Sequence, residues 1–179
     1  MHRPTSILIP LALLTVATTV MADAAAIVTE LGKISAQTDK VEGIVTGFSA
    51  GIKGLGDVVP LLIESTELLI DIKKATKVAK ASEPLDLDGV IAIVGPTQAL
   101  VADVQSLLAA ITNAKPKFDK LLIVSPVVLL NLKQQRKATE ELNNAVISKV
   151  PADFQGLARD LVAPIYVAFD ATIAEYSKK

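Results

Sequence analysis

The sequence predicts an all-α fold, a single antiparallel bundle of about five helices, and two observations support this prediction. Apolar residues recur at alternating steps of three and four along five separate segments, which is the spacing of one helix face. No segment alternates between apolar and polar residues for long enough to indicate a strand. The 179 residues, 51% of them hydrophobic, suit one domain with a sizeable core.

The first 22 residues are expected to be a secretory signal peptide. A short basic start precedes an apolar run from Ile7 to Val20, which falls short of the roughly 20 residues that a membrane span needs. Small or apolar residues lead up to Ala22, so we expect cleavage after Ala22, with Ala24 as the alternative. A retained N-terminal anchor is the competing interpretation. The mature domain is then 23–179, a secreted protein with no transmembrane segment.

Composition excludes several classes of function. The only histidine is His2, and the chain has no cysteine, so the expected mature chain lacks the residues of Ser-His-Asp or Cys-His catalysis and of zinc sites. A net charge of −1 and an aromatic content of 3% argue against a nucleic-acid partner, which requires a basic face or stacking platforms. We therefore expect neither an enzyme nor a cofactor.

Five apolar stripes, each a row of apolar residues at helical spacing, mark the expected helices. They run over residues 27–48, 58–79, 87–111, 118–132 and 154–173. The expected connections are the glycine-rich stretch 47–56, Ser82-Glu83-Pro84, Asn113 with Pro116, and Val150-Pro151.

Local signals refine these helices. Pro60 is expected in the first turn of the second helix, and Asp86 with Asp88 is expected to cap the third. The segment 133–148 is polar and reads as a solvated face. Its expected ion pairs, at a spacing of four residues, are Arg136–Glu140 and Lys137–Glu141.

The first four stripes each contain a small hydroxyl residue, namely Thr38, Ser65, Thr97 and Ser125. Such a hydroxyl either bonds to its own backbone carbonyl one turn back or points into a cavity that holds the polar head of an apolar ligand.

Three prolines fall inside the last three apolar segments: Pro96, Pro126 and Pro164. An interior proline kinks a helix because it removes a backbone hydrogen bond. Kinked helices indicate either an enclosed apolar cavity or the ordinary curvature of a bundle, and both interpretations remain open.

The chain resembles the fungal hydrophobic surface-binding protein A family, which includes the cell-wall galactomannoproteins. The resemblance covers about Ala26 to Tyr176. It is carried by cysteine-free aliphatic helices, the turn Lys149-Val150-Pro151-Ala152-Asp153-Phe154 and the ending from Phe169 to Tyr176. The resemblance implies a secreted or wall-associated lipid-binding protein that is not an enzyme. Some members enclose a long-chain fatty acid whose carboxylate is held by serines, a role that maps here onto Ser65 and Ser125.

These expectations define a candidate site and its partners. The ligand is a fatty acid or similar lipid, and the expected lipid-binding residues are Ser65, Ser125, Thr97, Leu62, Leu69, Leu122 and Leu129. The alternative function is adsorption, in which the protein coats hydrophobic surfaces and recruits a secreted hydrolase. Cell-wall components are a further expected partner.

Overall fold

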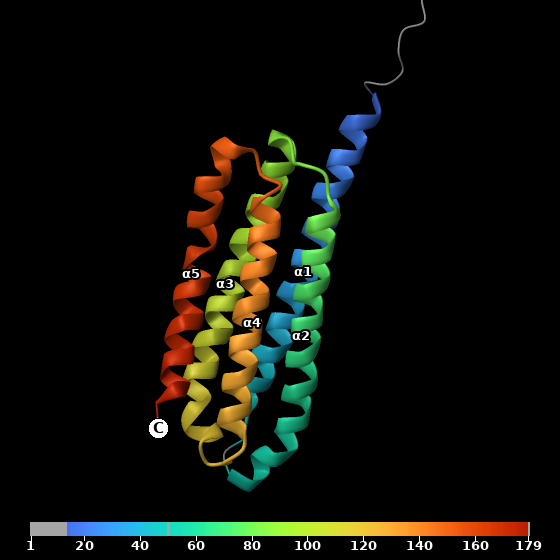
Figure 1. Ribbon diagram of the computed structural model, residues 1–179. Coiled ribbons are helices and arrows are strands. Elements are labelled where there is room, and N and C mark those ends of the chain that lie inside the picture. The colour runs from blue at the N-terminus through green and yellow to red at the C-terminus, as the bar shows by residue number, and fades with distance from the viewer. Residues whose placement is uncertain (1–13, 50, 179) are drawn as a thin grey trace, which may run out of the picture.

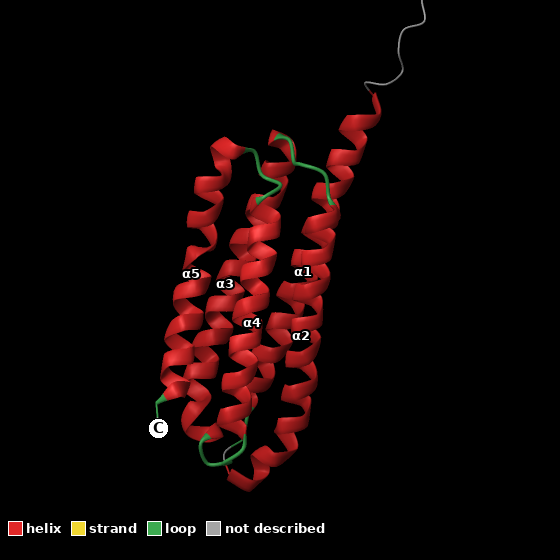
Figure 2. Ribbon diagram, viewed as in Figure 1, coloured by secondary structure: helices red, strands yellow, loops and turns green. Residues whose placement is uncertain are grey.

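Five long helices make up the protein in a computed structural model that describes residues 14–49 and 51–178. The described residues form no strand, which confirms the all-α prediction, and loops gather at the two ends of the molecule (Figure 2). The elements are α1 (Leu14–Gly47), the short 3-10 helix η2 (Gly51–Gly54), α2 (Leu55–Ala81), α3 (Leu87–Phe118), α4 (Val124–Ile147) and α5 (Ala152–Ser177) (Figure 1).

The expected signal segment falls partly outside the described residues, since residues 1–13 are not among them. Residues 14–22 form the first turns of α1, which project beyond the end of the bundle (Figure 1). Just after the expected cleavage site the chain is held by the bundle: the Asp23 carboxylate accepts a hydrogen bond from the backbone N–H of Glu83, and Ala24 is buried. Cleavage after Ala22 stays a prediction.

The helices form a closed ring in which each packs mainly against two neighbours. The order around the ring is α1, α2, α4, α5 and α3, and α3 returns to α1. Consecutive helices run in opposite directions, as expected of an antiparallel bundle. The ring order nevertheless places α1 beside α3, α3 beside α5 and α2 beside α4, and the helices of each of these pairs run parallel (Figure 1).

A ring of five helices is difficult to fill. Packed helix axes lie about 8–10 Å apart, so the centre of a five-membered ring lies roughly 7–8.5 Å from each axis. A helix with its side chains has a radius of only about 5–6 Å. Aliphatic side chains therefore reach the centre incompletely, which is the geometric basis for internal cavities in this fold.

The connection between α3 and α4 differs from the sequence prediction. The sequence places Phe118 in the fourth helix, whereas α3 continues through Pro116 and ends at Phe118. The turn 119–123 separates the predicted fourth stripe into two parts: Phe118 ends α3 and Leu122 is exposed in the turn, whereas Leu129 and Leu132 pack on the core from α4, as predicted. In addition, α4 buries a row that contains polar members: Val124, Leu132, Gln135, Ala138, Thr139, Leu142, Ala145 and Ile147.

Two prolines also occupy positions other than those expected. Pro126 is the third residue of α4, where its missing N–H has no intrahelical partner, so it does not interrupt that helix. Pro60 lies inside α2 and not in its first turn, because that helix already begins at Leu55. Pro96 and Pro164 lie inside α3 and α5, as predicted.

Most of the expected polar contacts are present. The Asp86 side chain caps α3 by accepting a hydrogen bond from the backbone N–H of Gly89 at 2.8 Å, which confirms the predicted cap. Arg136 pairs with Glu140 at 2.7 Å. Among the described residues Lys137 makes no ion pair with Glu141, so that prediction is wrong.

The two ends of the bundle are closed differently. We name them after Figure 1: the lower end contains η2 and the turn 119–123, and the upper end contains the connections 82–86 and 148–151. At the lower end the rings of Phe48 and Phe118 meet edge to face at 4.6 Å. Gly54 lies against Phe48, and a Cβ there would stand 2.3 Å from the Ser49 carbonyl oxygen and 2.8 Å from the Phe48 ring. At the upper end the Leu85 N–H donates to the Lys149 carbonyl at 2.7 Å.

Candidate functional site

Three cavities lie inside the ring and follow one another along the bundle. The lower cavity has a volume of about 90 Å³, the middle cavity about 30 Å³ and the upper cavity about 210 Å³. Gln135 lines both the lower and the middle cavity, while Leu100, Asn143 and Ile165 line both the middle and the upper one. The three spaces therefore adjoin one another at the side chains that they share.

The lower cavity is enclosed by α1, α2, α4 and the end of α3. Its wall is aliphatic, and half-exposed side chains of α2, the turn 119–123 and α4 border its opening: Leu62, Ile123 and Val127. Phe118 closes the side toward the lower end of the bundle.

A small polar cluster stands at the inner side of the lower cavity. The Ser65 hydroxyl donates to the Leu62 carbonyl at 3.2 Å and lies 3.5 Å from the Asn131 amide nitrogen, Nδ2. The Gln135 amide nitrogen, Nε2, donates to the Ser65 carbonyl oxygen at 3.2 Å, and Gln135 is buried. Two amide donors and one hydroxyl thus converge where the lower cavity meets the middle one.

The upper cavity is larger and lies between α3, α4 and α5. Its polar members are Thr97, Gln98 and Asn143, the last of which donates to the Tyr166 hydroxyl at 3.0 Å. Phe154 and Leu157, both exposed, stand at its rim. The linings of all three cavities consist of uncharged residues. They can therefore accommodate an apolar chain and donate hydrogen bonds to a polar head, but they supply no proton-transferring group.

The local interpretation of the hydroxyl residues is confirmed for three of the four. Thr38 bonds to the Ile34 carbonyl at 2.8 Å, Thr97 to the Ile93 carbonyl at 2.7 Å, and Ser65 to its own helix as described. Each of these residues also lines a cavity: Ser65 the lower, Thr38 the middle and Thr97 the upper. The two interpretations of the hydroxyls are therefore compatible.

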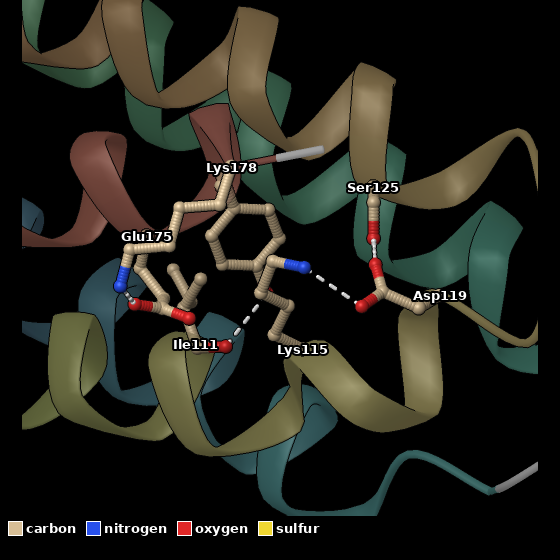
Figure 3. Close-up of polar contacts among 7 residues, drawn as sticks. Ile111, Lys115, Asp119, Ser125, Glu175 and Lys178 are labelled. Carbon is tan, nitrogen blue, oxygen red and sulfur yellow. Dashed lines mark hydrogen bonds and ion pairs between the residues drawn. The ribbon is translucent and has the colours of Figure 1, made fainter.

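Ser125 is placed differently from the other three. Its hydroxyl donates to the Asp119 carboxylate at 2.6 Å, and Lys115 donates to the same carboxylate at 2.7 Å (Figure 3). These two contacts hold the pKa of Asp119 below its usual value, and the contact with Lys115 has the larger effect. Ser125 thus belongs to the turn between α3 and α4, and the structure does not bring it together with Ser65 in one cavity.

The predicted leucines are also divided. Leu62 lines the lower cavity, whereas Leu69 and Leu129 are half-buried against the core and outside the cavity linings. Leu122 is 90% exposed in the turn before α4. The ligand-binding role of all seven predicted residues stays a prediction, but only Ser65, Leu62 and Thr97 border a cavity.

Sequence reasoning missed the amides of α4. Asn131, Gln135 and Asn143 border the cavities, yet Gln135 and Asn143 fall in the segment 133–148, which reads as a solvated face. A signal was present: Leu132, Gln135, Thr139 and Leu142 follow one another at helical spacing, and all four are buried.

One buried carboxylate lies outside the cavities. Glu30 of α1 is 7% exposed and pairs with Lys33 at 2.7 Å and with Lys74 of α2 at 3.5 Å. The hydrogen bond from Lys33 is the main reason that the pKa of Glu30 lies below its usual value. No cluster of three metal-ligating side chains occurs within the residues that the structure describes.

The comparison of sequences identifies relatives with a known name. The family model described as hydrophobic surface binding protein A matches residues 24–148. Cell wall mannoprotein 1 of Aspergillus flavus is 27% identical over 143 residues, which are 80% of this chain and 50% of that protein. The corresponding protein of Aspergillus fumigatus is 27% identical over 146 residues, 82% of this chain and 49% of that one. The chain therefore spans about half the length of these curated relatives.

Solved structures share the fold. The crystal structure of AFMP4P in complex with palmitic acid superposes with a TM-score of 0.80 at 25% identity, over 86% of this chain and 99% of that one. Ligand binding domain 1 of the Penicillium marneffei MP1 protein, complexed with arachidonic acids, gives a TM-score of 0.80 at 19% identity, over 87% and 99% of the two chains.

The family model covers the helices from Ala24 of α1 through α4, and the solved structures extend the likeness over most of the chain. The family model agrees with the predicted family, although its match ends at residue 148, before the turn at Val150-Pro151. The solved structures agree with the five-helix ring. The chain belongs to the hydrophobic surface binding protein A family.

Proposed function

We propose that this protein binds a long-chain fatty acid inside its helical ring and acts as a carrier without catalysis. The observation that supports this proposal most strongly is the lower cavity, an aliphatic space with two amides and a hydroxyl at its inner side and an opening at its outer side. The carboxylate binds at Ser65, Asn131 and Gln135, and the alkyl chain extends toward the opening.

Hydrogen-bond chemistry favours a carboxylate at the polar cluster. Asn131 and Gln135 at present donate to oxygens of Ser65, at 3.5 and 3.2 Å. A carboxylate is a stronger acceptor than these neutral oxygens, and a charge-assisted hydrogen bond is worth about 1.5–3 kcal/mol. Such bonds offset part of the cost of burying the negative charge.

The length of the lower cavity suits an alkyl chain, and its volume of about 90 Å³ means that the lining side chains must move apart when a long chain enters. Gln135 and Ile123 lie 12 residues apart along the chain, which is about 18 Å in a helix that rises 1.5 Å per residue. Each methylene group removed from water contributes about 0.8 kcal/mol, so a long alkyl chain offsets the entropic cost of binding.

The upper cavity provides a second place for an alkyl chain, next to Thr97. It is larger than the lower one, and its polar residues Thr97, Gln98 and Asn143 resemble the lower cluster in chemistry. A solved structure of similar fold, ligand binding domain 2 of the Penicillium marneffei MP1 protein, is described as complexed with multiple arachidonic acids.

Native mass spectrometry of the purified protein tests the proposal. We expect the protein to retain lipid, to lose it on solvent extraction, and to take up added palmitate again. A protein that neither retains lipid nor takes up palmitate contradicts the proposal.

A double variant tests the position of the carboxylate. Ser65→Ala with Asn131→Leu is expected to weaken palmitate binding about tenfold or more, because charge-assisted bonds are lost. The matched ligand is 1-hexadecanol, which has the same chain and no charge, and its affinity is expected to change far less. Equal losses for the two ligands would place the carboxylate elsewhere.

A second function, adsorption to hydrophobic solids, is supported by the outer face of α3. This helix is long and apolar enough to cross a membrane, but it packs as a member of the ring, and only 28% of its most apolar window is buried. Its exposed outer residues include Ala92, Gly95, Ala99 and Ala102. Between Gly89 and Ala114 its only ionisable residue is Asp103, which accepts a hydrogen bond from Ser35.

Adsorption to polystyrene beads tests this second function. Ala99→Glu with Ala102→Glu is expected to reduce adsorption strongly, whereas Thr66→Glu on the exposed face of α2 is expected to leave it unchanged. Undiminished adsorption of the α3 variant would exclude this face.

The cellular setting is also a proposal. We propose a secreted or cell-wall location, supported by the relatives named cell wall mannoprotein 1 and by the expected signal peptide. Recruitment of a secreted hydrolase and binding to cell-wall components stay predictions.

A further inference from the structure

The lower end of the bundle exposes apolar side chains from two neighbouring segments. We call them the lower patch: Leu55, Val59, Leu62, Ile63, Leu122, Ile123 and Val127. Leu122 and Ile123, in the turn before α4, are 90% and 68% exposed. Two consecutive aliphatic side chains at the tip of a turn are unusual on a surface that only contacts water.

The lower patch is continuous with the lower cavity. Leu62, Ile123 and Val127 are exposed on the surface and also line the cavity. An apolar path therefore leads from the outside of the lower end to the polar cluster at Ser65, Asn131 and Gln135.

The end of the bundle that contains this patch is basic overall. The described residues of the lower end carry more lysines than carboxylates: Lys53, Lys115, Lys117, Lys120 and Lys178 against Asp57, Asp119 and Glu175. All three carboxylates accept hydrogen bonds within the protein, from the Ser49 N–H, from Lys115 with Ser125, and from Lys178. Lys53 and Lys120 are exposed, and among the described residues neither makes an ion pair.

The upper end has the opposite charge. It also exposes apolar residues near a cavity, Phe154 and Leu157, but its charged residues are mainly acidic. They are Asp23, Glu83, Asp86, Asp88 and Asp153 against Lys80 and Lys149. Exposed apolar groups thus occur at both ends, and only the lower end combines them with positive charge.

We propose that the lower patch docks on an anionic lipid bilayer, with its aliphatic side chains inserted between head groups and Lys53 and Lys120 at the phosphates. Charge complementarity selects this partner, because an apolar surface flanked by exposed lysines binds more strongly to membranes that contain anionic lipids. For ligand exchange the inference rests on the proposed function. The carboxylate of a fatty acid leaves the bilayer before its alkyl chain, passes the lysines and reaches the polar cluster, and the alkyl chain follows from the membrane.

Sedimentation with vesicles tests the docking, using delipidated protein so that the result is independent of fatty-acid binding. We expect binding to phosphatidylcholine vesicles that contain phosphatidylserine, weaker binding to pure phosphatidylcholine, and a decline with added salt as screening increases. Equal binding to both vesicle types, or binding to neither, overturns the proposal.

Matched variants locate the docking surface. Lys53→Glu with Lys120→Glu is expected to weaken binding by at least about fivefold per lysine, and Leu55→Ser with Val59→Ser by about tenfold. The controls are Lys77→Glu with Lys80→Glu, and Leu157→Ser near the upper cavity, which should bind vesicles as the unmodified protein does. Equal losses in controls and lower-end variants overturn the assignment.

Two further measurements separate this inference from the proposed function. The lysine and Leu55/Val59 variants lie outside the cavity lining, so their palmitate affinity in solution should be unchanged while palmitate transfer from vesicles slows. Vesicle binding without palmitate binding would refute the fatty-acid proposal and leave docking intact. Palmitate binding without vesicle binding would refute the docking and leave the fatty-acid proposal intact.

Discussion

The lower and upper cavities differ in a way that volume alone does not convey. The upper cavity is more than twice as large, yet the lower one brings Asn131 and Gln135 toward Ser65 and opens at a basic surface. The upper cavity lies toward the end of the bundle that carries more carboxylates than lysines, a charge that disfavours an anionic ligand. For an amphiphile, the location of hydrogen-bond donors and charge decides which space receives the head group.

The two ends of the bundle differ in how tightly they are packed. Replacing one glycine at each end by alanine and measuring the unfolding free energy tests this difference. Gly54→Ala places a Cβ against the Ser49 carbonyl oxygen and the Phe48 ring, so we expect a loss of about 2–3 kcal/mol in unfolding free energy. Gly89→Ala at the upper end meets its nearest atom, an Asp86 carboxylate oxygen, at 3.2 Å and gains helix propensity. A change within about 1 kcal/mol is expected there, and urea denaturation of both variants provides the measurement.

Filling one cavity at a time tests which one is the principal site. Val128→Phe introduces a ring into the lower cavity and Ala158→Phe into the upper one. Overpacking costs about 1–3 kcal/mol, so Val128→Phe should weaken palmitate binding about fivefold to 100-fold. Ala158→Phe should leave the first palmitate in place and remove only a second one. Native mass spectrometry reports the stoichiometry, and the reverse pattern would assign the principal site to the upper cavity.

A smaller effect is expected from pH, where the comparison is between buried Glu30 and exposed Asp119. Both carboxyl groups have a pKa in the folded protein below the ordinary value, so the unfolded chain binds protons more readily than the native one. Their stabilising contribution is complete above the ordinary pKa, 4.5 for Glu30 and 3.8 for Asp119, and is lost as the pH falls through the lowered values.

Thermal unfolding over the acid range measures this contribution. Glu30→Gln should flatten the decline of the unfolding temperature below pH 4.5. Asp119→Asn should flatten it less and at lower pH, because water screens an exposed pair. A larger effect of Asp119 would show that the turn between α3 and α4, and not the α1–α2 contact, limits stability in acid.

The sequence predicted the helices well because aliphatic periodicity reports directly which face is buried. The predicted stripes of α1, α2, α3 and α5 contain buried residues such as Ile34, Ile72, Leu108 and Phe169. Some stripe members are nevertheless exposed, namely Leu62, Leu87, Val94 and Leu157. Prediction failed where periodicity was interrupted. The turn 119–123 separates the fourth stripe into two parts, so Ser125 and Leu122, which continue the spacing from Phe118, face the turn and the solvent.

The polar part of the site was harder to predict for a related reason. Ser65 and Thr97 stand out because each hydroxyl interrupts an apolar stripe, and each lines a cavity. Gln135 stands among charged and polar residues of α4, where an amide looks like part of a solvated face. Its burial depends on α2, which packs beside α4, and on α1, which lines the same cavity from across the ring. This is tertiary information that no window of α4 contains.

The odd number of helices in the ring has an electrostatic consequence. Helix macrodipoles cancel in antiparallel pairs, but α1, α3 and α5 point toward the lower end and only α2 and α4 toward the upper one. One dipole is left over, with its negative pole at the lower end. Lysines near the negative pole and carboxylates near the positive pole stabilise this dipole. The net side-chain charge at each end exceeds the roughly half a charge at each end of one helix dipole. The side-chain charges of the two ends thus oppose the unpaired helix dipole, and near an anionic surface they favour an orientation with the lower end in front before any contact is made.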